Sequence, residues 1–219
     1  MAKTLYLEEH RLKHLLKVAA VSGELPVRSM ALIYAVYGTG MMLTELARLP
    51  VAKYLKANGS ILEKSCIPAE YAYNGKERPL WWSNAKVTSA IDQYLQYRAE
   101  NKHLTTTRKA AYRGLDPDSP IFLNTDGCPY KLTKRKTAVG NLSYSCDSLS
   151  QLFRKLHQQA GIEGASAMSG RRTFAVRLHR KGYDLRHINE LLGHETLSAT
   201  KRLIDADPVR LGAIVAGVI

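Results

Sequence analysis

Cysteine is scarce in this chain and gives no sign of a covalent or metal framework. A disulfide framework or a zinc site needs cysteines at close, paired spacings, and no C-x-x-C pair occurs here. The three cysteines are Cys66, Cys128 and Cys146. We therefore predict no metal site and expect a reducing, intracellular setting.

Long apolar runs are also missing. The most apolar stretch, residues 31–46, is interrupted by two glycines and carries Glu45, so it is too short and too polar to span a bilayer. The first residues are rich in Glu, His, Arg and Lys, so a signal peptide is not predicted. We expect a cytoplasmic protein without membrane attachment.

Acidic residues are outnumbered by basic ones. The chain has 19 Asp and Glu against 32 Lys and Arg, which gives a formal net charge of +13. Such an excess indicates a polyanionic partner, although a basic protein without one remains an alternative. With 219 residues, 45% of them hydrophobic, the chain can bury a substantial core, so disorder of the whole chain is excluded.

The apolar residues that are present recur mostly at helical spacing. Residues 31–36 are apolar all round, as expected of a buried helix. Asp184 is a suitable N-cap for a short helix that Gly193 would end in the left-handed conformation. Three further apolar stripes are Leu12, Leu15, Leu16 and Ala19; Val87, Ala90, Ile91, Tyr94 and Leu95; and Leu149, Leu152, Phe153 and Leu156.

One region has strand-like composition. Residues 67–73 and 76–82 flank Asn74-Gly75, which predicts a β-hairpin with a type I′ turn. Residues 116–144 carry several Pro and Gly turn signals and predict a loop with little regular structure. The expected fold is mainly α with a small antiparallel sheet (α+β).

Several short strings occur in an order that points to one family. Gly38–Leu49 reads GTGMMLTELARL and resembles the box usually written TGLRxSELxxL, and Asn74–Leu80 fits the family's sheet. Gly170-Arg-Arg-Thr-Phe-Ala175 and Leu191-Leu-Gly-His194 match its C-terminal motifs. Over nearly its whole length the chain resembles the catalytic domain of the tyrosine recombinase (phage integrase) family. The resemblance implies a single such domain over residues 1–219, with the family's separate N-terminal core-binding domain absent.

The resemblance also implies a chemistry. In the family a tyrosine attacks a DNA phosphodiester and forms a 3′-phosphotyrosyl link, without metal or cofactor. Two arginines stabilise the charge that develops on the phosphate, because a planar guanidinium fork matches two phosphate oxygens. A lysine protonates the leaving oxygen, and two further donors, usually histidines, handle the nucleophile's proton.

Carried over residue by residue, most of these groups are replaced. The second arginine and the second histidine are retained as Arg171 and His194. No tyrosine follows the nucleophile position, so a catalytically inactive chain is expected. Ser198 and Thr200 carry the nearest hydroxyl groups in the sequence. Lys76 lies close enough to the lysine position to replace the family's lysine. The replaced positions are Met42 for the first arginine, Tyr73 for the lysine, Met168 for the first histidine and Leu203 for the nucleophile.

Basic residues are expected to contact DNA across the family's active-site face. Instead of contacting DNA, Arg171 could be a buried residue whose guanidinium binds loop carbonyls. His194 could likewise be a surface or capping residue. A further basic patch is expected at Arg108, Lys109 and Arg113. The predicted DNA contacts are Arg171, Arg172, His194, Lys76, Arg78, Lys131, Lys134, Arg135, Lys136, Arg177, Arg180 and Lys181.

We therefore expect a double-stranded DNA-binding regulator of transcription, replication or transfer in a mobile element. Two alternatives remain open: an active but divergent site-specific recombinase, and a module that docks on a recombinase and modulates it. The apolar segment 211–219 is a candidate contact to a second copy or to another DNA-binding protein.

Overall fold

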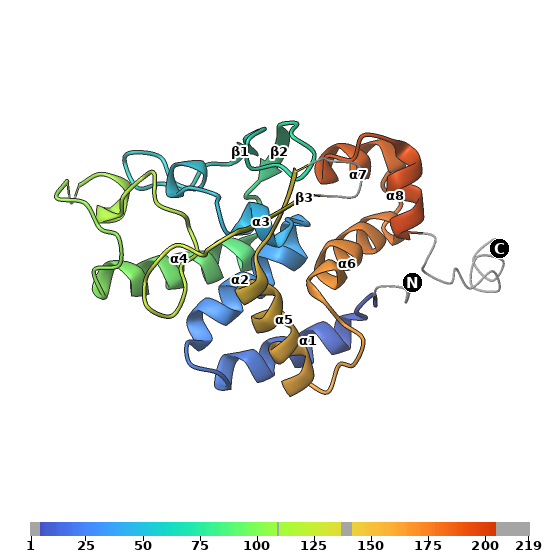
Figure 1. The fold of residues 1–219 in the computed structure, drawn as a ribbon, viewed down its shortest axis with the longest axis horizontal. Coiled ribbons are helices and arrows are strands. Elements are labelled where there is room, and N and C mark those ends of the chain that lie inside the picture. Colours follow the sequence, from blue (N-terminus) through green and yellow to red (C-terminus); the bar gives the residue numbers. More distant parts are fainter. Residues whose placement is uncertain (1–4, 109, 137–141, 205–219) are drawn as a thin grey trace.

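A computed structural model describes residues 5–108, 110–136 and 142–204 (Figure 1). These residues form eight α-helices, two 3-10 turns and two small antiparallel sheets, which confirms the expected fold class. No described helix is long and apolar enough to cross a membrane. The helices are α1 (Glu9–Val21), α2 (Pro26–Thr39), α3 (Leu43–Leu46), α4 (Ala85–Glu100), α5 (Asp147–Gln159), α6 (Ala167–Arg180), α7 (Leu185–Leu192) and α8 (Leu197–Ile204). The 3-10 turns are η1 (Val51–Lys53) and η2 (Tyr112–Gly114).

The main core is built from the apolar faces that the helical spacing predicted. Leu12, Leu15 and Ala19 of α1 are buried, as are all five members of the stripe on α4. Residues 31–36 lie in α2, which packs against α1, α4 and α6. Leu152 of α5 is only partly buried, whereas its neighbours on the same stripe are fully enclosed.

A second, smaller apolar cluster joins α6, α7 and α8 at the side of the molecule drawn in orange and red (Figure 1). Its buried members are Ala175, Ile188, Leu192 and Ile204. The predicted caps of α7 are confirmed, because the Asp184 side chain accepts from the backbone of residue 186 and the residue after Leu192 is left-handed. Helix α7 of this cluster packs beside strand β2 (Arg78–Trp81).

The predicted hairpin exists, but its strands and its turn differ from the expectation. β1 (Lys64–Ile67) pairs with β2 (Arg78–Trp81), and Ile67 lies opposite Arg78. The residues between them form a ten-residue loop in which Gly75 alone has positive φ, so a type I′ turn is wrong. The physical reason is that Asn74 is used elsewhere: its amide donates to the carbonyl of Gly193.

The region predicted as irregular contains a second sheet. β3 (Thr133–Lys136) pairs antiparallel with β4 (Leu142–Ser145), beside α3. Part of the basic run 131–136 is thus a strand rather than a loop. Upstream, residues 116–132 form turns and isolated bridges, as the Pro and Gly signals predicted.

Candidate functional site

Arg171 lies at the centre of the family positions, buried in α6. Its exposed fraction is 2%, and its two Nη atoms donate to the carbonyls of Gly40, at 2.7 Å, and Leu192. The structure therefore shows the buried fork that the sequence left open as an alternative. Burial and, next, the positive charge of Arg78 lower the pKa of Arg171 to about 10, so the guanidinium still carries its charge near neutral pH.

The Gly40 carbonyl reaches Arg171 because α2 ends in a left-handed glycine. Gly40 has φ +68°, and a Cβ built there would come within 2.8 Å of Phe174 and 2.9 Å of Leu192. Only glycine fits this turn between α2, α6 and α7. The glycine of the TG motif thus has a packing role beside its place in the family box.

Arg78 was expected to project toward DNA, and this is wrong. Its side chain is 2% exposed and forms an ion pair with the fully buried Glu45, at 2.6 Å from Nη2 to Oε2. Its Nη1 also donates to the carbonyl of Leu191, at 2.7 Å. A buried guanidinium needs such partners, so Arg78 connects the first family box, β2 and the end of α7.

His194 follows the glycine that ends α7, and its ring is half-buried. Its Nδ1 lies 2.8 Å from the hydroxyl of Thr200, which is fully buried and also accepts from Asn189. Burial first, and then the charges of Arg171 and Arg78, lower the pKa of His194 to about 4. The imidazole is therefore neutral near pH 7.

Tyr73 occupies the place between these two retained residues. The Arg171 Cζ lies 5.3 Å from the centre of the Tyr73 ring, and the His194 ring meets it edge-on at 6.4 Å between centres. The structure thus brings together the positions that the resemblance assigned to the second arginine, the second histidine and the lysine. Lys76, the suggested replacement for that lysine, is exposed. Its Nζ lies 3.4 Å from Oε1 of Glu195, with which it forms an ion pair.

Met42 and Met168 line a groove of about 880 Å³ next to Tyr73. Met42 precedes α3 and Met168 lies in the first turn of α6, so two of the replaced positions belong to the lining of one groove. Leu203 is not part of this groove, because it packs on the cluster of α6, α7 and α8. Of the nearby hydroxyls, Ser198 is exposed and Thr200 is buried.

The predicted basic contacts divide into exposed and engaged groups. Arg177 and Arg180 share a helix face as predicted, but that face turns toward α1, where the two side chains pair with Glu9 and Glu8. Both arginines are thus engaged by glutamates in this structure, and their contact with DNA stays a prediction. The exposed members of the set are Lys76, Lys131, Lys134, Lys136, Arg180 and Lys181.

The remaining members are buried, paired or undescribed. Arg172 is 4% exposed, which contradicts its placement on an open DNA-binding surface. In the further basic patch, Arg113 forms an ion pair with Asp92, 2.8 Å from Nη1 to Oδ1, whereas Arg108 is exposed. Lys109, the side chain of Arg135 and the segment 211–219 lie outside the described residues.

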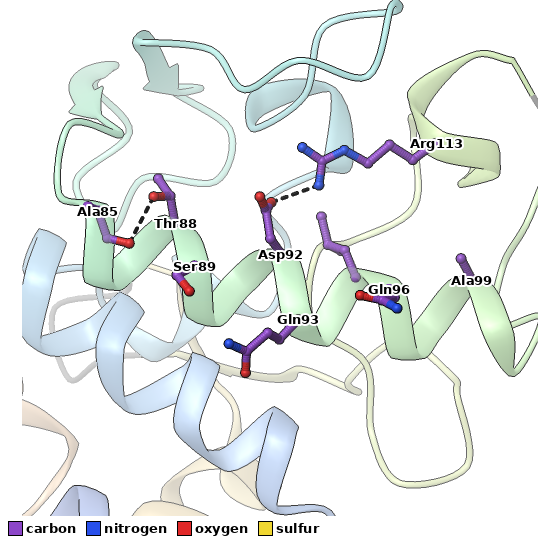
Figure 2. Close-up of a pocket in the computed structure, with 9 residues that line it drawn as sticks. Ala85, Thr88, Ser89, Asp92, Gln93, Gln96, Ala99 and Arg113 are labelled. Carbon is purple, nitrogen blue, oxygen red and sulfur yellow. Dashed lines mark hydrogen bonds and ion pairs between the residues drawn. The ribbon is translucent and has the colours of Figure 1, made fainter.

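A second hollow of about 780 Å³ runs along the outer side of α4 (Figure 2). Arg113 reaches over it toward Asp92, and Thr88 Oγ1 donates to the carbonyl of Ala85. The hollow contains no position that the family motifs single out. It is lined by Ala85, Thr88, Ser89, Asp92, Gln93, Leu95, Gln96, Ala99 and Arg113.

One residue of the groove was missed by the sequence reasoning. The guanidinium of Arg48 lies between two tyrosine rings, 5.2 Å from the centres of both Tyr71 and Tyr144, and donates to the carbonyls of Glu70 and Tyr71. It joins α3 to the loop after β1 and to β4. The contact to Tyr144 spans 96 positions, so no local sequence pattern indicates it.

The model of the phage integrase family matches residues 6–209. The chain belongs to the phage integrase family, the tyrosine recombinases. Tyrosine recombinase XerC of Bacillus pumilus is 30% identical over 200 residues, which cover 90% of this chain and 55% of that protein. XerC of Lactobacillus delbrueckii subsp. bulgaricus is 28% identical over 178 residues, covering 81% of this chain and 50% of that one.

A solved recombinase has the same fold. The crystal structure of XerA recombinase superposes with a TM-score of 0.70 at 19% identity, covering 99% of this chain and 65% of that one. The family member described here thus spans about half the length of the curated XerC relatives it matches.

Proposed function

We propose that this chain is a catalytically inactive member of the family that binds double-stranded DNA. The observation that carries the proposal is the use of Arg171: both Nη atoms are bound to the carbonyls of Gly40 and Leu192, and the ring of Tyr73 covers the guanidinium. A phosphate in transfer needs preorganised donors, and thioethers at Met42 and Met168 supply none.

DNA binding is supported by charge and by relationship. Thirteen positive charges remain after every Asp and Glu is set against a Lys or Arg, and exposed lysines lie at the β3–β4 sheet beside the groove. Among structures with this fold is XerH recombinase bound to its difH substrate, with a TM-score of 0.66 at 20% identity and 99% of this chain covered. The proposed role is regulation of transcription, replication or transfer in a mobile element.

A salt titration of duplex binding tests the first half of this proposal. The logarithm of affinity is expected to fall linearly with the logarithm of salt, by about 0.9 per phosphate neutralised. Lys134→Glu with Lys136→Glu is expected to flatten that slope, whereas Lys17→Glu on α1 serves as the control from an exposed site outside the groove. Duplex binding that is undetectable at low salt would refute the assignment.

A covalent trapping assay tests the second half. The unmodified protein is incubated with nicked duplex and denatured, and no protein–DNA band is expected, because no tyrosine occupies position 203. Any such band would favour the divergent recombinase instead. A genome-wide footprint of bound DNA then distinguishes two cases. A regulator would bind at control regions or at the ends of a mobile element, whereas a non-specific DNA-binding protein would bind throughout the genome.

A further inference from the structure

Exposed apolar side chains gather in the groove at the family positions. Of the seven large apolar residues that are exposed in the described chain, three line this groove: Tyr73 and Tyr144 at 45%, and Met168 at 36%. An exposed apolar patch in a concave site is typical of ligand binding rather than of chance exposure. The volume of about 880 Å³ lies within the usual range for small-ligand pockets.

The aromatic wall is held in place before any ligand arrives. Tyr144 is fixed by the guanidinium of Arg48, which is itself bonded to the carbonyl of Tyr71 at 2.7 Å. Tyr73 is fixed in the same way, against Arg171 and His194. Binding to such a rigid platform loses little side-chain entropy.

The rim of the groove is basic where β3 and β4 pass it. Lys134 lies directly opposite Tyr144 in the sheet, so the two side chains share one face, and Lys136 lies on that face two residues on. Both lysines are exposed. The lining itself holds one cation, Arg48, and one carboxylate, Glu70, so the excess positive charge beside the groove comes from the two lysines of β3.

Stacked duplex DNA cannot use this combination, because neighbouring base pairs cover the π-faces of its bases and leave only base edges and phosphates accessible. An unstacked nucleotide presents both a flat π-face and an adjacent phosphate, and aromatic platforms beside cations bind such groups regardless of base identity. We propose that the groove between Met42, Tyr73, Tyr144 and Met168 binds an unstacked base of single-stranded DNA, with Lys134 and Lys136 at its phosphates. This inference rests on the proposed function and specifies a ligand for its site.

Fluorescence anisotropy with a labelled oligothymidine of about ten nucleotides tests the inference, since single-strand sites span about 4–16 nucleotides. Tyr144→Ala is expected to raise the dissociation constant at least about fivefold, because stacking of one base contributes about 1–3 kcal/mol. Tyr144→Phe keeps the ring and is expected to bind like the unmodified chain. Tyr183→Ala is the matched control, since Tyr183 is 54% exposed but lies outside the groove.

Photo-crosslinking locates the bound base. With 5-iododeoxyuridine in the oligonucleotide, adducts are expected on peptides that contain Tyr144 or Met168. Adducts confined to Trp81 or Tyr183, or unchanged single-strand affinity in a folded Tyr144→Ala protein, would overturn the inference. Circular dichroism melting and duplex affinity of each variant report folding. Retained duplex binding without single-strand binding removes this inference alone, whereas loss of both in the unmodified chain removes the proposed function as well.

Discussion

The ring of Tyr73 lies over the guanidinium of Arg171, with 5.3 Å between the Arg171 Cζ and the ring centre. A tyrosine here places a flat, polarisable surface where the resemblance assigns a mobile lysine. Together with the two backbone carbonyls, the ring encloses the arginine on several sides. The retained arginine is therefore part of the packed structure, and its first measurable effect should be on stability.

Replacing Arg171 is expected to destabilise the protein. Arg171→Ala leaves the carbonyls of Gly40 and Leu192 without their donor, which should reduce the free energy of unfolding by about 2–5 kcal/mol. Arg171→Lys keeps the charge but loses the fork, so its loss should be intermediate. Urea denaturation measures both, with the exposed Arg186→Ala as control. An unfolding free energy within error of the unmodified protein would contradict the fork.

The buried pair of Arg78 and Glu45 should show strong coupling. Arg78→Met leaves the Glu45 carboxylate buried and unpaired, which should cost about 3–5 kcal/mol. The double variant Arg78→Met with Glu45→Leu removes both charges and should recover part of that loss, although the carbonyl of Leu191 stays unsatisfied. A double-mutant cycle measures the coupling, and simple additivity of the two single effects would rule it out.

His194 should make the protein sensitive to acid. Its pKa is lowered to about 4 in the fold from an ordinary 6.5, so the unfolded chain takes up the proton first as the pH falls. Its contribution to stability is full above about pH 6.5 and is lost progressively toward about pH 4. His194→Asn retains a polar group near Thr200 but does not titrate. The free energy of unfolding of this variant, measured as a function of pH, should decline less steeply between about pH 7.5 and pH 5. Parallel curves for the two proteins would show that His194 is not the titrating group.

Restoring the nucleophile alone should not restore cleavage. Leu203→Tyr places a phenol at the family position, but each missing donor around a reacting phosphate typically costs about 100- to 1,000-fold in rate. Met42 and Met168 would still lack donors, so no covalent band is expected. The smallest change expected to give an adduct combines Met42→Arg, Met168→His and Leu203→Tyr. Denaturing gels of nicked-substrate reactions compare the single and triple variants.

Local patterns predicted the helices well. The stripes of α1 and α4 were correct because their apolar spacing reports which face meets the core, and Asp184 capped α7 as its position indicated. The hairpin was misjudged because Asn74-Gly75 has the composition of a tight turn, whereas a partner far along the chain, the carbonyl of Gly193, holds Asn74 in a wider loop.

The fate of charged residues was the least predictable part. Arg78 looks like a surface cation in sequence, and its burial follows from Glu45, 33 positions earlier, on another element. The spacing of Arg177 and Arg180 correctly gave a shared face, but it carries no information on which element that face meets. The partner of a charge is a tertiary property, so single-sequence patterns leave it open.

The small apolar cluster of α6, α7 and α8 has a consequence for the history of the site. Arg171 donates to Leu192, inside that cluster, and to Gly40, at the end of α2 in the main core. Arg78 likewise ties the end of α7 to α3. The two arginines therefore connect two separately packed parts of the chain through buried hydrogen bonds. Selection for folding would preserve such a structural arginine even without selection for DNA cleavage. An arginine at this position is therefore a poor marker of an active recombinase.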